Sequence, residues 1–265
     1  MRAHIIGKYG VKFAAILVLL KIQKTKHCMG GHSFTFKQFH IDQDRCAMKV
    51  GTDSIVLGSW TPVRGAKRIL DIGTGTGILA LMLAQRTAQQ VQIDAVELDK
   101  DAVKQAEENI NASPWRERIR VIRHDIRTFQ APHYDLIISN PPYFVHGQTL
   151  PDAARQLARH TGELDQTALL ESAARLLTPF GKLALVLPVE EGEQLVALAT
   201  AGGWYLQRRC RVETKRGKAP NLVLLLLSRK PAETEEEQLC LRETDNRYSP
   251  EFIALADEFY LRMSA

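Results

Sequence analysis

The sequence offers little from which to build a disulfide scaffold, a metal centre or a membrane span. It has only four cysteines and no CxxC pair, and its eight histidines show no spacing typical of metal ligands. The apolar run at residues 11–20 is interrupted by Lys12 and is too short to cross a bilayer. These absences favour a reduced, cytoplasmic protein with no metal site and no stable membrane association. The cysteines are Cys28, Cys46, Cys210 and Cys240.

Acidic residues are missing from the first 28 positions, which contain six lysines and arginines. The formal net charge of the chain is +5, so residues 29–265 carry a net charge of −1. The body of the protein is therefore near neutral, and any nucleic-acid surface must be a local patch. We expect residues 1–32 to be an extension that is dispensable or disordered. A membrane-surface anchor is the alternative that its basic composition leaves open.

Strand-like and helix-like patterns alternate from Lys67 onward, which predicts a mostly parallel sheet with helices on both faces. The last two strands follow each other without a helix and predict an antiparallel hairpin at the C-terminal edge. The acidic residues 233–237 are typical of a solvated turn. We expect one α/β domain over residues 33–265, with a cap at 33–66 and a core at 67–265. The seven predicted strands are 68–72, 92–97, 119–123, 134–139, 182–187, 204–212 and 222–228.

A glycine-rich turn follows the first of these strands, at Asp71-Ile72-Gly73-Thr74-Gly75-Thr76-Gly77. Its glycines allow positive φ and let a ligand approach the backbone closely. Gly75, Gly77 and Ala80 also satisfy GxGxxA, the fingerprint of dinucleotide sites. Asp71 would repel a pyrophosphate, however, and favours a ligand that carries a cationic ammonium group.

Two further acidic residues follow the next two predicted strands. Glu97 ends the second strand, where a carboxylate can accept hydrogen bonds from both hydroxyls of a ribose. Asp125 follows the third strand and can accept from an adenine amino group, while Ile126 covers the ring. Ligands of open α/β sheets bind at the carboxyl edge, where these residues meet. An ammonium group, a ribose and an adenine in that order describe S-adenosylmethionine.

The segment from Met48 to Asp53 is a polar turn that opens a predicted short helix. Its backbone N–H groups and hydroxyls, including those of Lys49 and Thr52, can contact a ligand. A helix cap by Thr52 or Asp53 is the simpler interpretation.

The fourth predicted strand ends at Asn140-Pro141-Pro142-Tyr143. The two prolines forbid a helix and remove two backbone donors, so the tip presents an amide, bare carbonyls and an aromatic ring. The Asn140 oxygen and the Pro141 carbonyl can accept the two N–H bonds of an amino group, and Tyr143 can stack on a base. A tight packed turn is the alternative interpretation.

These motifs together resemble the Rossmann-type methyltransferases that act on exocyclic or amide nitrogens. Residues 34–39, 44–53 and 109–115 also resemble the bacterial tRNA(Val) adenine N6-methyltransferases, and the resemblance runs from about Phe34 to the C-terminus. It implies a Rossmann-like class I fold and S-adenosyl-L-methionine as the methyl donor. It also implies N6 of adenine 37, in the anticodon loop of tRNA(Val), as the acceptor.

The expected site residues follow from these motifs and this resemblance. The expected catalytic residues are Asn140, Pro141, Pro142 and Tyr143. The expected cofactor contacts are Lys49, Thr52, Asp71, Gly73, Gly75, Gly77, Glu97, Leu98, Asp125, Ile126 and Asn140.

We expect a monomer that binds tRNA, and three alternatives remain open. The same tip also suits another amino group, in an rRNA or DNA base or in a protein glutamine. The chain could also be a non-catalytic module that binds S-adenosylmethionine or RNA, or a nicotinamide-dependent oxidoreductase. Candidate RNA contacts are Arg116, Arg118, Arg120, Arg123, Arg208, Arg209, Arg211, Lys215, Arg216, Lys218 and the loop 144–159.

Overall fold

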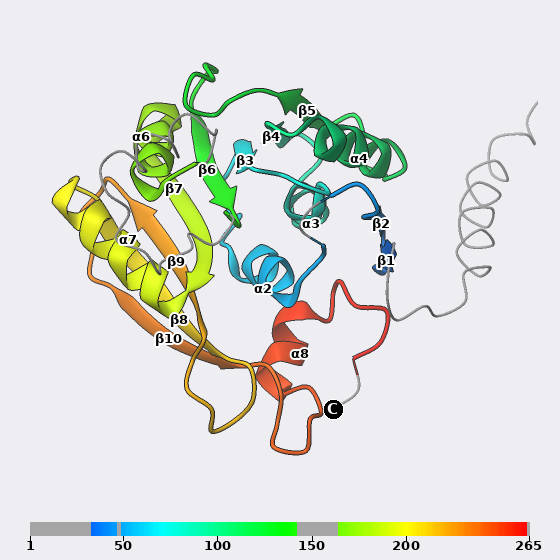
Figure 1. Ribbon diagram of the computed structural model, residues 1–265, viewed down its shortest axis with the longest axis vertical. Helices are drawn as coiled ribbons and strands as arrows, with labels where there is room; N and C mark the ends of the chain where they lie inside the picture. Colours follow the sequence, from blue (N-terminus) through cyan, green and yellow to red (C-terminus); the bar gives the residue numbers. More distant parts are fainter. Residues whose placement is uncertain (1–32, 47–48, 142–163, 264–265) are drawn as a thin grey trace, which may run out of the picture. The chain divides into compact units, whose positions relative to one another are not determined.

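Strands alternate with helices over residues 68–123 and again over residues 134–213 (Figure 1). The computed structural model describes residues 33–46, 49–141 and 164–263, and the predicted extension at 1–32 lies outside them. The elements are β1 (Ser33–Thr35), β2 (His40–Asp42), α2 (Thr52–Trp60), β3 (Arg68–Ile72), α3 (Ile78–Arg86), β4 (Gln92–Glu97), α4 (Lys100–Asn111), β5 (Ile119–Arg123), β6 (Tyr134–Ser139), α6 (Gln166–Leu176), β7 (Leu177–Pro188), α7 (Val189–Ala201), β8 (Tyr205–Glu213), β9 (Leu222–Ser228), β10 (Glu235–Cys240) and α8 (Pro250–Ala256).

Strands β3 to β10 form one sheet in the order β10-β8-β9-β7-β6-β3-β4-β5. Among these described strands, β9 runs antiparallel to its neighbours β7 and β8, and every other neighbouring pair is parallel. The prediction of an α/β fold with a mostly parallel sheet and a C-terminal antiparallel pair is therefore confirmed.

The chain reverses its path across the sheet between β3 and β6. From β3 it continues to β4 and β5 on one side, and then crosses back to β6 on the other side of β3. Strand β3 pairs in parallel with both neighbours, from Ile69 to Asp71 against β6 and along its whole length against β4. Such a switch point leaves a crevice at the carboxyl ends of the strands, where ligands of open α/β sheets bind.

The outer edge of the sheet is a strand that the sequence analysis missed. Strand β10 pairs in parallel with β8, so the prediction of a solvated turn at residues 233–237 was wrong. The described sheet has eight strands instead of the predicted seven, and β10 covers the outer side of the β8–β9 pair. Contacts with distant residues stabilise this strand. The Glu237 carboxylate accepts hydrogen bonds from Arg208 Nε at 2.7 Å and from Trp60 Nε1 at 2.8 Å.

Two hydrophobic clusters fill the two faces of the sheet. Helices α2, α3, α4 and α8 pack on the face that includes Ile69 and Ile138. Helices α6 and α7 pack on the other face, which includes Leu70 and Ile137. Successive residues of a strand point to opposite faces, so strands covered on both sides need continuous apolar sequence. Strand β9 shows this pattern, because all of its residues are buried.

The N-terminal cap packs against the C-terminal segment. Strands β1 and β2 pair antiparallel. The Phe36 ring stacks on Phe39 with centroids 4.5 Å apart, and the Lys37 backbone N–H donates to the Phe259 carbonyl at 2.8 Å. The cap is thus attached to the sheet-and-helix core by contacts between distant parts of the chain.

Candidate active site

Four polar side chains lie at or near the carboxyl ends of neighbouring strands. Asn140 follows β6, Asp71 lies in β3, Glu97 ends β4, and Asp125 follows β5. The strand order β6-β3-β4-β5 places them in the spatial order Asn140, Asp71, Glu97, Asp125, although Asn140 comes last in the sequence. The switch point therefore brings the predicted catalytic tip beside the predicted cofactor turn.

The turn between β3 and α3 requires its glycines. Gly73, Gly75 and Gly77 have φ values of 69°, 54° and 84°, in the left-handed region that costs other residues about 1–2 kcal/mol. A Cβ on Gly73 or Gly75 would project into open space, so a ligand can reach the backbone at both positions. The N–H groups of Gly73 and Thr74 donate to the Val96 carbonyl at 2.9 and 3.2 Å. These bonds tie the turn to the adjacent strand β4.

Asp71 is fully buried in front of this turn. Its Oδ2 accepts hydrogen bonds from Thr74 Oγ1 at 2.6 Å and from the Ala80 N–H at 3.2 Å, near the start of α3. Its Oδ1 is buried without a hydrogen-bond partner among the described residues. Burial raises the pKa of this carboxyl to about 7, and the nearby charge of Glu97 adds to the increase. A carboxyl in this state gains from a cationic partner.

The Glu97 carboxylate is held by three backbone N–H groups. Oε2 accepts from Gly75 at 3.0 Å, while Oε1 accepts from Leu98 at 2.8 Å and from Asp99 at 3.0 Å. These bonds place a negatively charged group at the end of β4, directly against the glycine turn. Two carboxylate oxygens at this position can accept hydrogen bonds from vicinal hydroxyls of a ligand.

The third acidic residue is engaged by a neighbour in the sequence. Both oxygens of Asp125 accept hydrogen bonds from the Arg127 side chain, and this pairing holds the pKa of Asp125 below its ordinary value. Ile126 is buried in the hydrophobic cluster on the α6 and α7 face. The Leu98 side chain, by contrast, is 46% exposed at the end of β4.

A pocket of about 430 Å³ opens beside the glycine turn. Its volume lies within the range of roughly 300–1,000 Å³ found for small-molecule sites. Five of the predicted cofactor residues line it, namely Lys49, Gly73, Gly75, Glu97 and Asn140. The other predicted contacts, Thr52, Asp71, Gly77, Leu98, Asp125 and Ile126, are not among the lining residues.

The sequence analysis did not single out the remaining lining residues. They are Cys46, Ser54, Thr74, Thr76, Ile78, Leu79, Asp99 and Ala102. Most of them lie within a few positions of the glycine turn or of Glu97, so extending those motifs would find them. Ser54 gives a weaker signal, a single hydroxyl at the start of an apolar helix.

Asn140 contacts α2 at the end of β6, and the residue before it contacts β3. Its Nδ2 donates to Ser54 Oγ of α2 at 2.9 Å. The preceding residue, Ser139, donates its Oγ to the Ile72 carbonyl at 2.7 Å and anchors β6 to β3. Pro141 is buried, whereas the predicted catalytic residues Pro142 and Tyr143 lie outside the described residues.

Helix α4 connects the cap to the glycine turn. Asn109 Nδ2 donates to the carbonyls of Asp42 at 2.9 Å and Thr76 at 2.8 Å, and Asn109 Oδ1 accepts from the Asp42 N–H at 2.9 Å. Gln105 Oε1 accepts from the Arg45 N–H at 3.2 Å. These bonds hold the segment after β2, which contributes Cys46 and Lys49 to the pocket, near the turn.

The thiol of Cys46 is in an environment that disfavours ionisation. Burial raises the pKa of this thiol to about 11, and the charges of Glu97 and Asp99 contribute to the increase. The basic neighbours of Cys46 in the sequence, Arg45 and Lys49, therefore do not activate it. Arg45 instead pairs with Glu108 of α4 at 2.6 Å.

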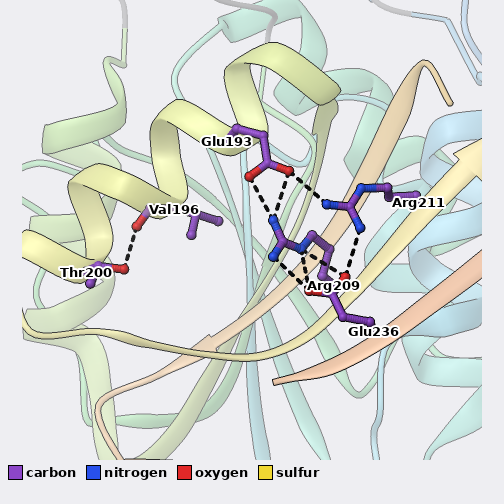
Figure 2. Close-up of polar contacts among 6 residues, drawn as sticks. All are labelled: Glu193, Val196, Thr200, Arg209, Arg211 and Glu236. Atoms are coloured by element: carbon purple, nitrogen blue, oxygen red, sulfur yellow. Dashed lines mark hydrogen bonds and ion pairs between the residues drawn. The ribbon is translucent and has the colours of Figure 1, made fainter. Parts of the chain in front are cut away.

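All four arginines of the predicted C-terminal RNA patch form ion pairs. Figure 2 shows Arg209 between Glu193 of α7 and Glu236 of β10, each at 2.7 Å, and Arg211 beside the same two carboxylates. Arg208 and Arg216 are paired in the same way, with Glu235, Glu237, Glu243 and Glu251. These arginines join α7, β8, β10 and the C-terminal segment, so less charge is available to phosphates than the sequence indicates.

One arginine of the predicted patch around β5 is structural, whereas Arg116, Arg120 and Arg123 are exposed. Arg118 is buried and donates to the Ala84 carbonyl at 3.1 Å and to Thr87 Oγ1 at 2.6 Å, which closes the end of α3. Its prediction as an RNA contact was wrong. Arg120 pairs with Asp94 at 2.9 Å.

The described ranges contain neither a candidate membrane span nor a candidate metal cluster. None of the helices there is both long enough and apolar enough for a membrane crossing. Nor do those ranges bring together three or more His, Cys, Asp or Glu side chains in a way that could hold a metal ion.

Comparison with known proteins identifies close relatives. Residues 46–198 match the Methyltransferase small domain family. The tRNA1(Val) (adenine(37)-N6)-methyltransferase of Aeromonas hydrophila subsp. hydrophila is 51% identical over 236 residues, which cover 89% of this chain and 100% of that protein. The enzyme of the same name from Yersinia enterocolitica is 47% identical over 241 residues, which cover 90% of this chain and 96% of that protein.

Solved structures share the fold at lower identity. A structure described as a predicted O-methyltransferase from Agrobacterium tumefaciens has a TM-score of 0.59 at 18% identity and covers 78% of this chain and 96% of that chain. NSun6 from Pyrococcus horikoshii has a TM-score of 0.53 at 18% identity, with 69% of this chain and 53% of that chain covered. These similarities confirm the predicted Rossmann-like methyltransferase fold.

Proposed function

Because the chain belongs to the tRNA1(Val) (adenine(37)-N6)-methyltransferase family, we propose that it methylates the exocyclic N6 of adenine 37 in the anticodon loop of tRNA(Val). The observation that carries this proposal is the shared pocket. Asn140, from the predicted catalytic tip, lines the same pocket as Gly73, Gly75 and Glu97 from the predicted cofactor site. A methyl donor and an amino acceptor can therefore meet there.

The residues around the pocket suit S-adenosyl-L-methionine as the methyl donor. Open space beside Gly73 and Gly75 exposes the backbone of the turn, and Glu97 offers two oxygens to ribose hydroxyls. The Oδ1 of buried Asp71, which has no hydrogen-bond partner in the described part of the chain, suits a cationic ammonium group nearby. The bound donor supplies an electrophilic methyl group on a sulfonium. We assign adenosine and methionine contacts also to Lys49, Thr52, Gly77, Leu98, Asp125 and Ile126.

In this proposal, Asn140 and Pro141 hold the target amino group. The lone pair of an adenine amino nitrogen is delocalised into the ring, so the nitrogen is a weak nucleophile. Acceptance of its two N–H bonds by Asn140 Oδ1 and the Pro141 carbonyl favours a more pyramidal nitrogen and stabilises the charge that develops on it. The orientation of the amino group supplies much of the acceleration.

The remaining parts of the tip complete the proposed site. Pro142 stiffens the backbone after Pro141, and Tyr143 stacks on the target base, which must leave the stack of the anticodon loop. No strong general base is required, since the alkylated nitrogen becomes acidic and loses its proton late. We further propose that the protein acts as a monomer in the cytoplasm and that residues 1–32 are dispensable for activity.

The test is methyl transfer by the purified protein from labelled S-adenosylmethionine to a tRNA(Val) transcript, followed by nucleoside analysis. The matched control is the same transcript with guanine at position 37. We expect N6-methyladenosine in the first transcript and no label in the second. Label in both transcripts, or in neither, would contradict the proposal. Asn140→Ala should abolish turnover but still bind S-adenosylmethionine, whereas Asn111→Ala, exposed at the end of α4, should leave both unchanged.

A further inference from the structure

Ser54 of helix α2 contacts the proposed catalytic amide. Its Oγ accepts a hydrogen bond from Asn140 Nδ2 at 2.9 Å, and both residues line the pocket. Ser54 is 6% exposed and is followed in its helix by the buried residues Ile55, Val56 and Leu57. A hydroxyl in such surroundings loses its contacts with water, and the bond to Asn140 compensates for that loss.

The hydrogen bond to Ser54 fixes the orientation of the Asn140 amide. The amide carries a donor nitrogen and an acceptor oxygen on one planar group, and rotation by half a turn exchanges them. When Nδ2 donates to Ser54, that rotation is opposed, and Oδ1 occupies the other corner of the amide. Methyl transfer to an amino group requires Oδ1 as the acceptor. If the Asn140 Nδ2 faced the substrate instead, its N–H groups would repel the N–H groups of the substrate amine.

We propose that Ser54 is a positioning residue for the methyl transfer, which holds the Asn140 amide with its oxygen directed to the substrate amino group. The inference rests on the proposed function, because it assigns a role within that reaction. Ser54 is contributed by the N-terminal cap, 86 positions before Asn140. The cap thus takes part in the chemistry, in addition to supplying Cys46 and Lys49 to the pocket.

The same helix contains a matched control. Ser59 is also buried, at 4% exposure, but its Oγ has no hydrogen-bond partner among the described residues. Ser54→Ala and Ser59→Ala therefore make the same chemical change on one helix, and only the first removes a contact with Asn140. A general effect of alanine on α2 would appear in both variants.

The experiment compares wild type, Ser54→Ala and Ser59→Ala in methyl transfer to the tRNA(Val) transcript at saturating substrate. We expect Ser54→Ala to lower kcat on the order of 10- to 100-fold, the size of effect that small misplacement of a reacting group produces. The Kd for S-adenosylmethionine, measured by calorimetry, should stay within about 3-fold of wild type, which is less than 1.4 kcal/mol. The reason is that the hydrogen bond removed joins Ser54 to Asn140. Ser59→Ala should keep the wild-type kcat.

Two further variants protect the test against misfolding. Ser54→Cys nearly preserves the side-chain volume but offers only a weak acceptor, so its kcat should fall as in Ser54→Ala. Ser54→Thr retains the hydroxyl and should recover most of the wild-type kcat.

The inference is overturned if Ser54→Ala and Ser54→Cys keep the kcat of Ser59→Ala, or if their loss of kcat is matched by an equal loss of S-adenosylmethionine affinity. A wild-type enzyme that does not methylate adenine 37 would instead refute the proposed function. The two failures are distinguishable. The first is read from the kcat and Kd of the variants, and the second from whether the wild-type enzyme methylates adenine 37.

Discussion

Glu97 Oε2 accepts a hydrogen bond from the Gly75 backbone N–H at 3.0 Å, which connects the end of β4 to the glycine turn after β3. The Glu97 carboxylate therefore both holds the glycine turn and lines the pocket. A substitution of Glu97 therefore removes both a contact that holds the turn and a carboxylate that lines the pocket.

Glu97→Ala should weaken S-adenosylmethionine binding about 10- to 100-fold, because hydrogen bonds to a charged group contribute roughly 1.5–3 kcal/mol. Glu97→Gln retains one oxygen and should lose less affinity. Calorimetric titration measures both values, and Glu107→Ala, on the exposed side of α4, is the control. An unchanged Kd in Glu97→Ala would remove Glu97 from the proposed cofactor site.

The raised pKa of Asp71 predicts a stability that falls with increasing pH. The pKa is about 7 in the folded protein, against an ordinary value of 3.8, so between these values the folded state holds a proton that the unfolded state has released. The free energy of unfolding contributed by Asp71 is therefore highest below about pH 4 and decreases until about pH 7, on the order of 1 kcal/mol per pH unit.

Urea unfolding at several pH values between 5 and 8 tests this, with Asp71→Asn as the comparison, since asparagine does not titrate. The stability of wild type minus that of Asp71→Asn should decrease as the pH rises and should level off above pH 7. A difference that is constant over this range would contradict the assignment. A cationic ligand beside Asp71 would favour its charged form, so S-adenosylmethionine affinity should rise through the same range.

Arg209 should matter for stability and not for tRNA binding. It bridges Glu193 and Glu236, and through them α7 and β10 (Figure 2). Arg209→Ala should lower the free energy of unfolding by about 1 kcal/mol, the upper end of the range for partly exposed pairs. Its effect on the Kd for tRNA should not exceed that of Arg64→Ala, which removes an exposed cation elsewhere. A large loss of tRNA affinity at unchanged stability would restore Arg209 as a phosphate contact.

Cys46 should react slowly with alkylating reagents. The thiolate is the reactive species, and a pKa of about 11 leaves little of it at pH 8. Labelling by iodoacetamide, followed residue by residue with mass spectrometry, should be slow at pH 8 and faster above pH 10. Because Cys46 lines the pocket, S-adenosylmethionine should slow the labelling further. Rapid labelling at pH 7 would show that the thiol is activated.

The sequence alone was sufficient for the fold class and for the local parts of the candidate site. Apolar runs such as Leu222–Ser228 indicate strands buried on both faces because each successive residue meets a covered surface. The glycines after β3 predict the turn correctly, because tolerance of positive φ is a property of glycine itself and all three glycines adopt it. Local chemistry of this kind depends on a few consecutive residues, and a sequence displays it directly.

Contacts between distant residues were decided only by the tertiary structure. Ser54 meets Asn140 because helix α2 packs beside the switch point, and no spacing in the sequence indicates that. Acidic residues 235–237 form an edge strand instead of a solvated turn because arginines on β8 and Trp60 pair with them. Arg118 is a buried helix cap instead of a phosphate contact for the same reason. A charged side chain has the same sequence signature whether its partner is a carboxylate, a carbonyl or a phosphate, and only the folded chain selects among them.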